Sequence, residues 1–122
     1  MKEYYDITSY NKNKIVFVKR GDKYITYNEC AIYLSDITGL KFTGKHPKLE
    51  LPFYYFNTIM DYLKKQSIEF MISDNYNITC YKSNPNMFDK VLLTYHILYR
   101  SYICSQILFR NHKPLELDDS IC

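Results

Sequence analysis

Residues 14–27, with the sequence KIVFVKRGDKYITY, decide how the chain folds. β-Branched and aromatic residues fill positions 15–18 and return at positions 24–27, with Gly21 and Asp22 between the two runs. Two such runs joined by a short turn that contains glycine predict a β-hairpin. The cations at the predicted tip are Lys19, Arg20 and Lys23. We therefore expect a basic turn that projects from a sheet.

The composition is that of an ordinary globular protein. The chain has 122 residues, 47% of them hydrophobic and 24% charged, and contains 14 tyrosines but no tryptophan. This length predicts a single domain, residues 1–122, with a core large enough to need no metal or disulfide. No apolar run is long enough for a signal peptide or a membrane-spanning helix, so we expect a cytoplasmic protein with no membrane partner.

The cysteines and histidines predict no metal centre. Four cysteines are widely and irregularly spaced, and the three histidines do not complete a zinc-binding spacing with them. We expect reduced thiols that are mostly buried, and no cofactor. We recognise no paired carboxylates, no nucleophile with its base and no glycine-rich phosphate loop, so we do not expect an enzyme.

Periodicity and capping signals predict the remaining elements. The predicted helices cover residues 2–10, 29–38, 53–66 and 87–111, and the further strands cover residues 40–43, 68–73 and 78–82, with a polar loop at 44–50. Asn28 is a good N-cap for the second helix, and Gly39 is suited to end it. The Ser-Asn-Pro segment at 83–85 favours the start of the long last helix. This order predicts an α/β fold, α+β by pattern, in which helices pack on a mixed β-sheet.

The net charge of +3 is only mildly basic, but the charges are distributed unevenly. A second basic segment, residues 41–48, has no acid and contains three lysines: Lys41, Lys45 and Lys48. The last segment, residues 114–122, is instead an acidic tail. We expect one end of the molecule to be positive. The alternative is a solvated, lysine-bearing surface without a partner.

Short motifs occur in a defined order across residues 15–72. They are Phe-Val-Lys-Arg-Gly-Asp-Lys-Tyr at 17–24, Leu-Lys-Phe-Thr at 40–43, Leu-Pro-Phe at 51–53, Tyr-Leu-Lys-Lys at 62–65 and Phe-Met-Ile at 70–72. In order and spacing, this set resembles the N-terminal mismatch-recognition domain, domain I, of the MutS family of DNA repair proteins. The resemblance implies the fold of that domain and, in a small stand-alone protein, a role in DNA binding.

The resemblance fails at the two positions that carry mismatch recognition. The family's Gly-Asp-Phe-Tyr-Glu turn supplies a Phe that stacks on the mispaired base and a Glu that hydrogen-bonds to it, and the matching positions here are Lys23 and Ile25. Lysine has no aromatic face with which to unstack bases, and isoleucine offers no hydrogen bond. The chain also has no phosphate-loop motif like that of the family's ATPase.

We therefore predict a non-catalytic module that contacts DNA phosphates without reading a mismatch. The residues predicted to bind DNA are Lys19, Arg20, Lys23, Lys41, Lys45 and Lys48, with the hairpin tip and the 41–48 segment side by side. Lysines placed in this way give salt-sensitive contacts that carry little sequence information. The alternative is a protein-interaction module of phage, viral or mobile-element origin, which binds a host or replication protein through the helix at 83–111 or through Tyr54 and Tyr55.

Overall fold

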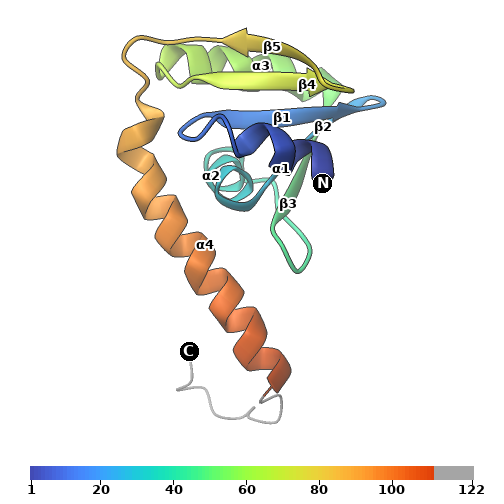
Figure 1. Ribbon diagram of the computed structural model, residues 1–122, viewed down its shortest axis with the longest axis vertical. Coiled ribbons are helices and arrows are strands. Elements are labelled where there is room, and N and C mark those ends of the chain that lie inside the picture. Colours follow the sequence, from blue (N-terminus) through green and yellow to red (C-terminus); the bar gives the residue numbers. More distant parts are fainter. Residues whose placement is uncertain (112–122) are drawn as a thin grey trace.

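The computed structural model of the chain describes residues 1–111, in which five strands form one mixed sheet (Figure 1). The strands are β1 Ile15–Arg20, β2 Lys23–Tyr27, β3 Lys48–Pro52, β4 Phe70–Asp74 and β5 Asn77–Tyr81. The helices are α1 Lys2–Thr8, α2 Asn28–Thr38, α3 Phe53–Lys65 and α4 Phe88–Asn111. The strand order is β3-β2-β1-β4-β5. A mixed sheet packed by helices, with a long C-terminal helix, confirms the predicted fold class.

The sheet consists of two antiparallel units joined by one parallel pair. β1, β2 and β3 pair antiparallel, as do β4 and β5, whereas β1 and β4 run parallel. The β1–β2 hairpin forms as predicted, with Arg20 opposite Lys23 and a two-residue turn between them. Gly21 in this turn has a φ of +61°, in the left-handed region that favours glycine.

The two faces of the sheet bury separate apolar clusters. On one face, α2, α3 and the start of α4 pack over β-strand side chains such as Phe17 and Phe70. On the other face, α1 packs Tyr4 and Ile7 against residues that include Ile25. The face of α3 that enters the core carries Phe56, Ile59 and Leu63, at helical spacing. Both faces of the hairpin are therefore used for packing.

The strand predicted at residues 40–43 is wrong. Only Thr43 makes an isolated bridge, to Lys48, and the strand lies at Lys48–Pro52, where we expected the end of a polar loop. Leu49 and Leu51 are fully buried, while Glu50 between them is exposed. This period-two alternation forms a strand even though its neighbours are charged.

The predicted N-cap at Asn28 is also wrong. Asn28 is the first residue of α2 and has a φ of +55°, and its side-chain amide donates to the Tyr5 hydroxyl at 3.1 Å instead of capping the helix. Tyr27 occupies the N-cap position and makes no side-chain cap hydrogen bond. Gly39 ends the helix as predicted, with a φ of +78° and its backbone N–H donating to the Ser35 carbonyl at 2.9 Å.

The long last helix is confirmed, although Asn86, rather than the Ser-Asn-Pro segment, satisfies its first turn. The Asn86 side-chain oxygen accepts a hydrogen bond from the Phe88 backbone N–H at 3.1 Å. α4 crosses α2, where Phe88 and Tyr95 both make edge-on contacts with Tyr33, and Figure 1 shows it continuing beyond the body of the domain. Among the described helices, none has the length and apolar content needed to cross a bilayer. The predicted acidic tail lies outside the described residues.

Candidate functional site

The two basic segments lie at opposite ends of β2 and β3, so the expectation that they lie side by side is wrong. Lys23 pairs with Pro52, and Tyr27 pairs with Lys48. The hairpin tip therefore adjoins the end of β3, whereas the 41–48 segment leads into its start (Figure 1). Four strand steps of about 3.3 Å separate the two ends, or roughly 13 Å of backbone. The error follows from the misplaced strand, because β3 begins after the basic loop.

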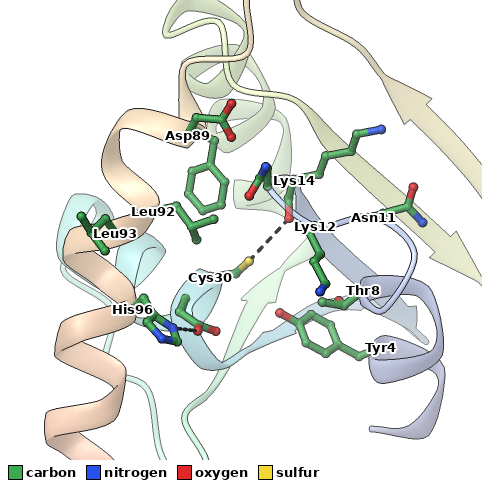
Figure 2. Close-up of a pocket in the computed structure, with 13 residues that line it drawn as sticks. Tyr4, Thr8, Asn11, Lys12, Lys14, Cys30, Asp89, Leu92, Leu93 and His96 are labelled. Atoms are coloured by element: carbon green, nitrogen blue, oxygen red, sulfur yellow. Dashed lines mark hydrogen bonds and ion pairs between the residues drawn. The ribbon is translucent and has the colours of Figure 1, made fainter.

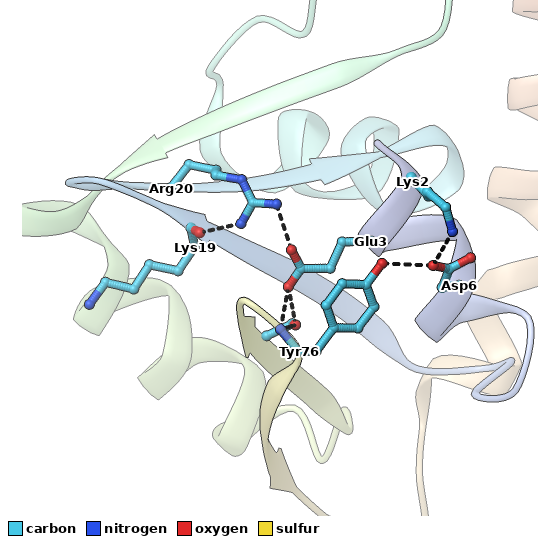
Figure 3. Close-up of polar contacts among 7 residues, drawn as sticks. Lys2, Glu3, Asp6, Lys19, Arg20 and Tyr76 are labelled. Atoms are coloured by element: carbon cyan, nitrogen blue, oxygen red, sulfur yellow. Dashed lines mark hydrogen bonds and ion pairs between the residues drawn. The ribbon is translucent and has the colours of Figure 1, made fainter.

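At the hairpin tip, Arg20 is held by a buried carboxylate from α1 (Figure 3). Its Nη2 lies 2.5 Å from Oε1 of Glu3, whose side chain is 4% exposed, and its Nη1 donates to the Lys19 carbonyl at 2.8 Å. Glu3 also accepts hydrogen bonds from the Ser73 hydroxyl and, at 3.0 Å, from the backbone N–H of Tyr76. Arg20 thus helps to hold α1 and the β4–β5 turn together.

The carboxylates of α1 remain ionised in this arrangement. Burial alone would raise the pKa of Glu3, but hydrogen bonds from Ser73, Arg20 and the Tyr76 backbone outweigh it, and the net pKa is lowered. Hydrogen bonds from Tyr76 and Lys2, at 2.7 and 2.9 Å, likewise lower the pKa of Asp6. Figure 3 shows both carboxylates reaching toward the same turn from one helix.

Two of the predicted lysines share one carboxylate. Lys23 Nζ lies 3.2 Å from Oε1 of Glu50, and Lys48 Nζ lies 3.1 Å from Oε2. These hydrogen bonds, first from Lys48 and then from Lys23, lower the pKa of Glu50. All three side chains are between about two-fifths and a half exposed, so the group carries one net positive charge that solvent can reach.

The other four predicted cations differ in their surroundings. Arg20 is engaged as described, whereas Lys19, Lys41 and Lys45 make no ion pair with any residue of the described part of the chain. Lys41 and Lys45 are exposed in the loop before β3, and Lys19 is half-buried at the end of β1. Lys19, Arg20 and Lys23 therefore all lie at the tip, with Lys19 on the α3 face of the sheet and the other two on the α1 face. Glu50 joins Lys48 to Lys23, which leaves Lys41 and Lys45 as a separate group.

Two exposed aromatic residues beside the tip were not among the predicted DNA-binding residues. The backbone N–H of Phe53 donates to the Asp22 carbonyl at 3.0 Å, which fixes the start of α3 against the turn. Phe53 is 57% exposed and Tyr54 is 76% exposed, and their ring centroids are 5.7 Å apart. The sequence contained a signal for the exposure of Tyr54. The apolar residues of α3 that enter the core, such as Phe56, recur at helical spacing, and Tyr54 falls outside that spacing.

The two positions that replace the mismatch-reading residues differ in accessibility. Lys23 begins β2, and its side chain is 54% exposed. Ile25 is only 9% exposed and belongs to the apolar cluster under α1. Position 25 is therefore a core position, and position 23 is a surface position.

Away from the hairpin tip, a concave region with a volume of about 520 Å³ lies between α1 and α4 (Figure 2). Leu92 and Cys30 form apolar parts of its wall, and Lys12 lies at its side. His96 Nδ1 lies 2.8 Å from Oε2 of Glu29 in this lining. Burial raises the pKa of the Cys30 thiol, which makes this cysteine a poor nucleophile.

The expectation of mostly buried thiols is wrong for the described cysteines. Cys30 is buried, but Cys80 and Cys104 are exposed, and all three are free. Cys80 lies on the edge strand β5, and Cys104 lies on a part of α4 that extends past the sheet. In residues 1–111, no group of three or more histidine, cysteine and acidic side chains is placed to hold a metal ion.

Comparison with known protein families assigns most of the chain to one of them. The sequence model of the family described as MutS domain I matches residues 1–100, a range that includes α1, all five strands and the first half of α4. No curated protein sequence matches the chain.

Proposed function

The chain belongs to the MutS domain I family, and on that premise we propose that it is a non-catalytic DNA-binding module. The observation that supports this proposal is the grouping of three cations, Lys19, Arg20 and Lys23, on one projecting turn of a domain from a DNA-recognition family. Cationic side chains on a projecting turn are suited to reach phosphates, which line the outside of a duplex.

The proposed contact is with the DNA backbone and not with a mispaired base. Lys23 and Ile25 stand where the family resemblance implies the stacking Phe and the hydrogen-bonding Glu. A lysine at position 23 adds charge, and a buried isoleucine at position 25 cannot reach a base. Binding should therefore depend on salt and differ little between matched and mismatched duplexes.

The two basic segments contribute separately under this proposal. The tip supplies Lys19 and Lys23, and the loop before β3 supplies Lys41 and Lys45, with Lys48 between them in space. A single duplex can touch both groups, because roughly 13 Å of strand separates them and the major groove is about 12 Å wide. Glu50 competes with phosphate for two of the lysines, so we expect weak binding even at low salt.

The decisive experiment is a fluorescence-anisotropy titration of the full chain against matched duplex, mismatched duplex and single-stranded DNA at several salt concentrations. We expect measurable affinity at about 50 mM salt and a linear fall of log K with log salt concentration. Combined K19E and K23E substitutions should weaken binding at least tenfold. A second double variant, K41E with K45E, makes the same charge change in the loop before β3 and serves as the matched comparison. Absence of binding to all three DNAs at low salt would overturn the proposal.

A second candidate function is protein binding through α4. Leu93 is 68% exposed and Ile97 is 57% exposed, one helical turn apart on α4. Exposed leucine and isoleucine at this spacing suit a helix-packing partner. If this is the function, the chain should elute from size-exclusion chromatography above monomer mass or with a partner, and L93S with I97S should abolish that species.

A further inference from the structure

The exposed aromatic pair at the start of α3 has no packing role in the domain. α3 is anchored by Phe56, Ile59 and Leu63, each no more than 3% exposed. Phe53 and Tyr54 lie outside this set, and most of each ring contacts solvent. A phenylalanine and a tyrosine held in this way add little to the stability of the fold, so their position calls for an interaction outside it.

The pair lies directly beside the cations of the hairpin tip. Lys23 is paired in register with Pro52, the residue before Phe53, and the Phe53 N–H is bound to the Asp22 carbonyl. Side chains alternate between the faces of a strand, so Lys19, which is paired with Tyr24, lies on the α3 side of the sheet with the aromatic pair. Lys23, which is paired with Arg20, lies on the α1 side. The start of α3 makes no side-chain cap hydrogen bond, so the positive end of the helix adds to the charge of Lys19.

The geometry of the rings distinguishes between nucleic-acid forms. The planes of Phe53 and Tyr54 are inclined by 80°. Two bases stacked on these rings are not parallel to each other, as neighbouring bases in a duplex must be. Successive bases of an extended single strand rotate independently and can lie on both rings, while their phosphates reach the lysines.

Resting on the DNA-binding function proposed above, we propose that Phe53 and Tyr54 form a stacking platform for unpaired bases, which gives the hairpin tip a preference for single-stranded DNA. Lys19, on the α3 side of the sheet, contacts the phosphates that flank the stacked bases. Stacking on aromatic faces tolerates every base, so the preference is for strandedness and not for sequence. A protein partner fits this surface less well, because lysines are depleted from the centres of protein interfaces.

The test compares a fluorescein-labelled oligothymidine with a labelled duplex of equal length, using the full chain. The double variant F53L and Y54L keeps apolar bulk at the start of α3 but removes both aromatic faces. We expect roughly fivefold to hundredfold weaker binding to the single strand and less than twofold change for the duplex. Tyr10→Leu is the matched control, since Tyr10 is 89% exposed and lies just after α1.

A direct readout uses the absence of tryptophan from the chain. Tyr54→Trp introduces a single reporter whose fluorescence is quenched when a base stacks on it, and Tyr10→Trp serves as its control. We expect quenching of the first variant by oligothymidine and not by duplex.

The outcomes separate this inference from the function on which it rests. If wild-type protein binds both DNAs and F53L with Y54L leaves the single-strand affinity within twofold, the platform is disproved while phosphate binding stands. Equal loss for single strand and duplex also disproves it. If no DNA binds at low salt, both proposals fail together.

Discussion

Arg20 Nη2 lies 2.5 Å from Glu3 Oε1, so the arginine of the hairpin tip is joined to the first helix of the chain. The contact links residues 17 positions apart and is made where Glu3 also binds Ser73 and Tyr76. A cation that looks available for DNA in the sequence is therefore part of the folded framework. Mutations of Arg20 will affect stability as well as any binding.

Removal of the Glu3 carboxylate should destabilise the domain. In Glu3→Ala, the Ser73 hydroxyl and the Tyr76 N–H lose a buried acceptor, and we expect a loss of roughly 2–3 kcal/mol in the free energy of unfolding. Urea denaturation followed by circular dichroism measures this loss. Asp6→Ala, which removes an exposed carboxylate from the same helix, should cost less than about 1 kcal/mol. Equal losses for the two variants would contradict the assigned role of Glu3.

The same carboxylate should make stability depend on pH. Folding lowers the pKa of Glu3 from its ordinary value of 4.5, so its contribution is complete above that value and is lost as pH falls through the folded pKa. Urea midpoints measured from pH 7 down to pH 3 should fall more steeply for the wild type than for Glu3→Gln. Parallel curves would show that Glu3 does not titrate differently in the two states.

Neutralising Glu50 should strengthen DNA binding under the proposed function. Glu50→Gln releases Lys23 and Lys48 from a shared carboxylate and removes one negative charge from the phosphate-facing surface. We expect a twofold to fivefold gain in affinity at low salt, which shrinks as salt is added. Asp89→Asn, an exposed carboxylate on α4, is the matched control. Equal gains for both variants would indicate a general charge effect instead of a local one.

Restoring the mismatch-reading residues should have unequal effects at positions 23 and 25. Lys23→Phe replaces a half-exposed side chain and should change stability by less than about 1 kcal/mol. Ile25→Glu places a carboxylate in the apolar cluster under α1 and should cost roughly 2–4 kcal/mol. Thermal melts of the two variants test this expectation. An Ile25→Glu protein as stable as the wild type would contradict this expectation and show that α1 can move to accommodate the carboxylate.

The parts of the fold that the sequence predicts are those governed by local rules. The β1–β2 hairpin follows from two β-branched runs around Gly21, and the end of α2 follows from Gly39. The family membership was also visible in the order of short motifs. These features depend on neighbours in the chain, and the structure and the family match agree with them.

The parts that were missed depend on contacts between distant residues. Asn28 leaves its expected capping role because Tyr5 binds its side chain, and Tyr5 is 23 positions away. Glu50 is recognised as the partner of Lys23 only when β2 and β3 are placed in register. For the same reason, the separation of the two basic segments required the correct position of β3.

The single parallel pair between β1 and β4 also has a consequence for how the chain reaches its native state. Hairpins β1–β2 and β4–β5 close over short loops, but the β1–β4 seam joins Ile15 to Phe70, 55 positions apart. Closing a loop of that length is entropically the most demanding event in the sheet, so this seam should govern the folding rate. Conservative truncations at the seam would then slow refolding, whereas changes at the hairpin tip would mainly accelerate unfolding.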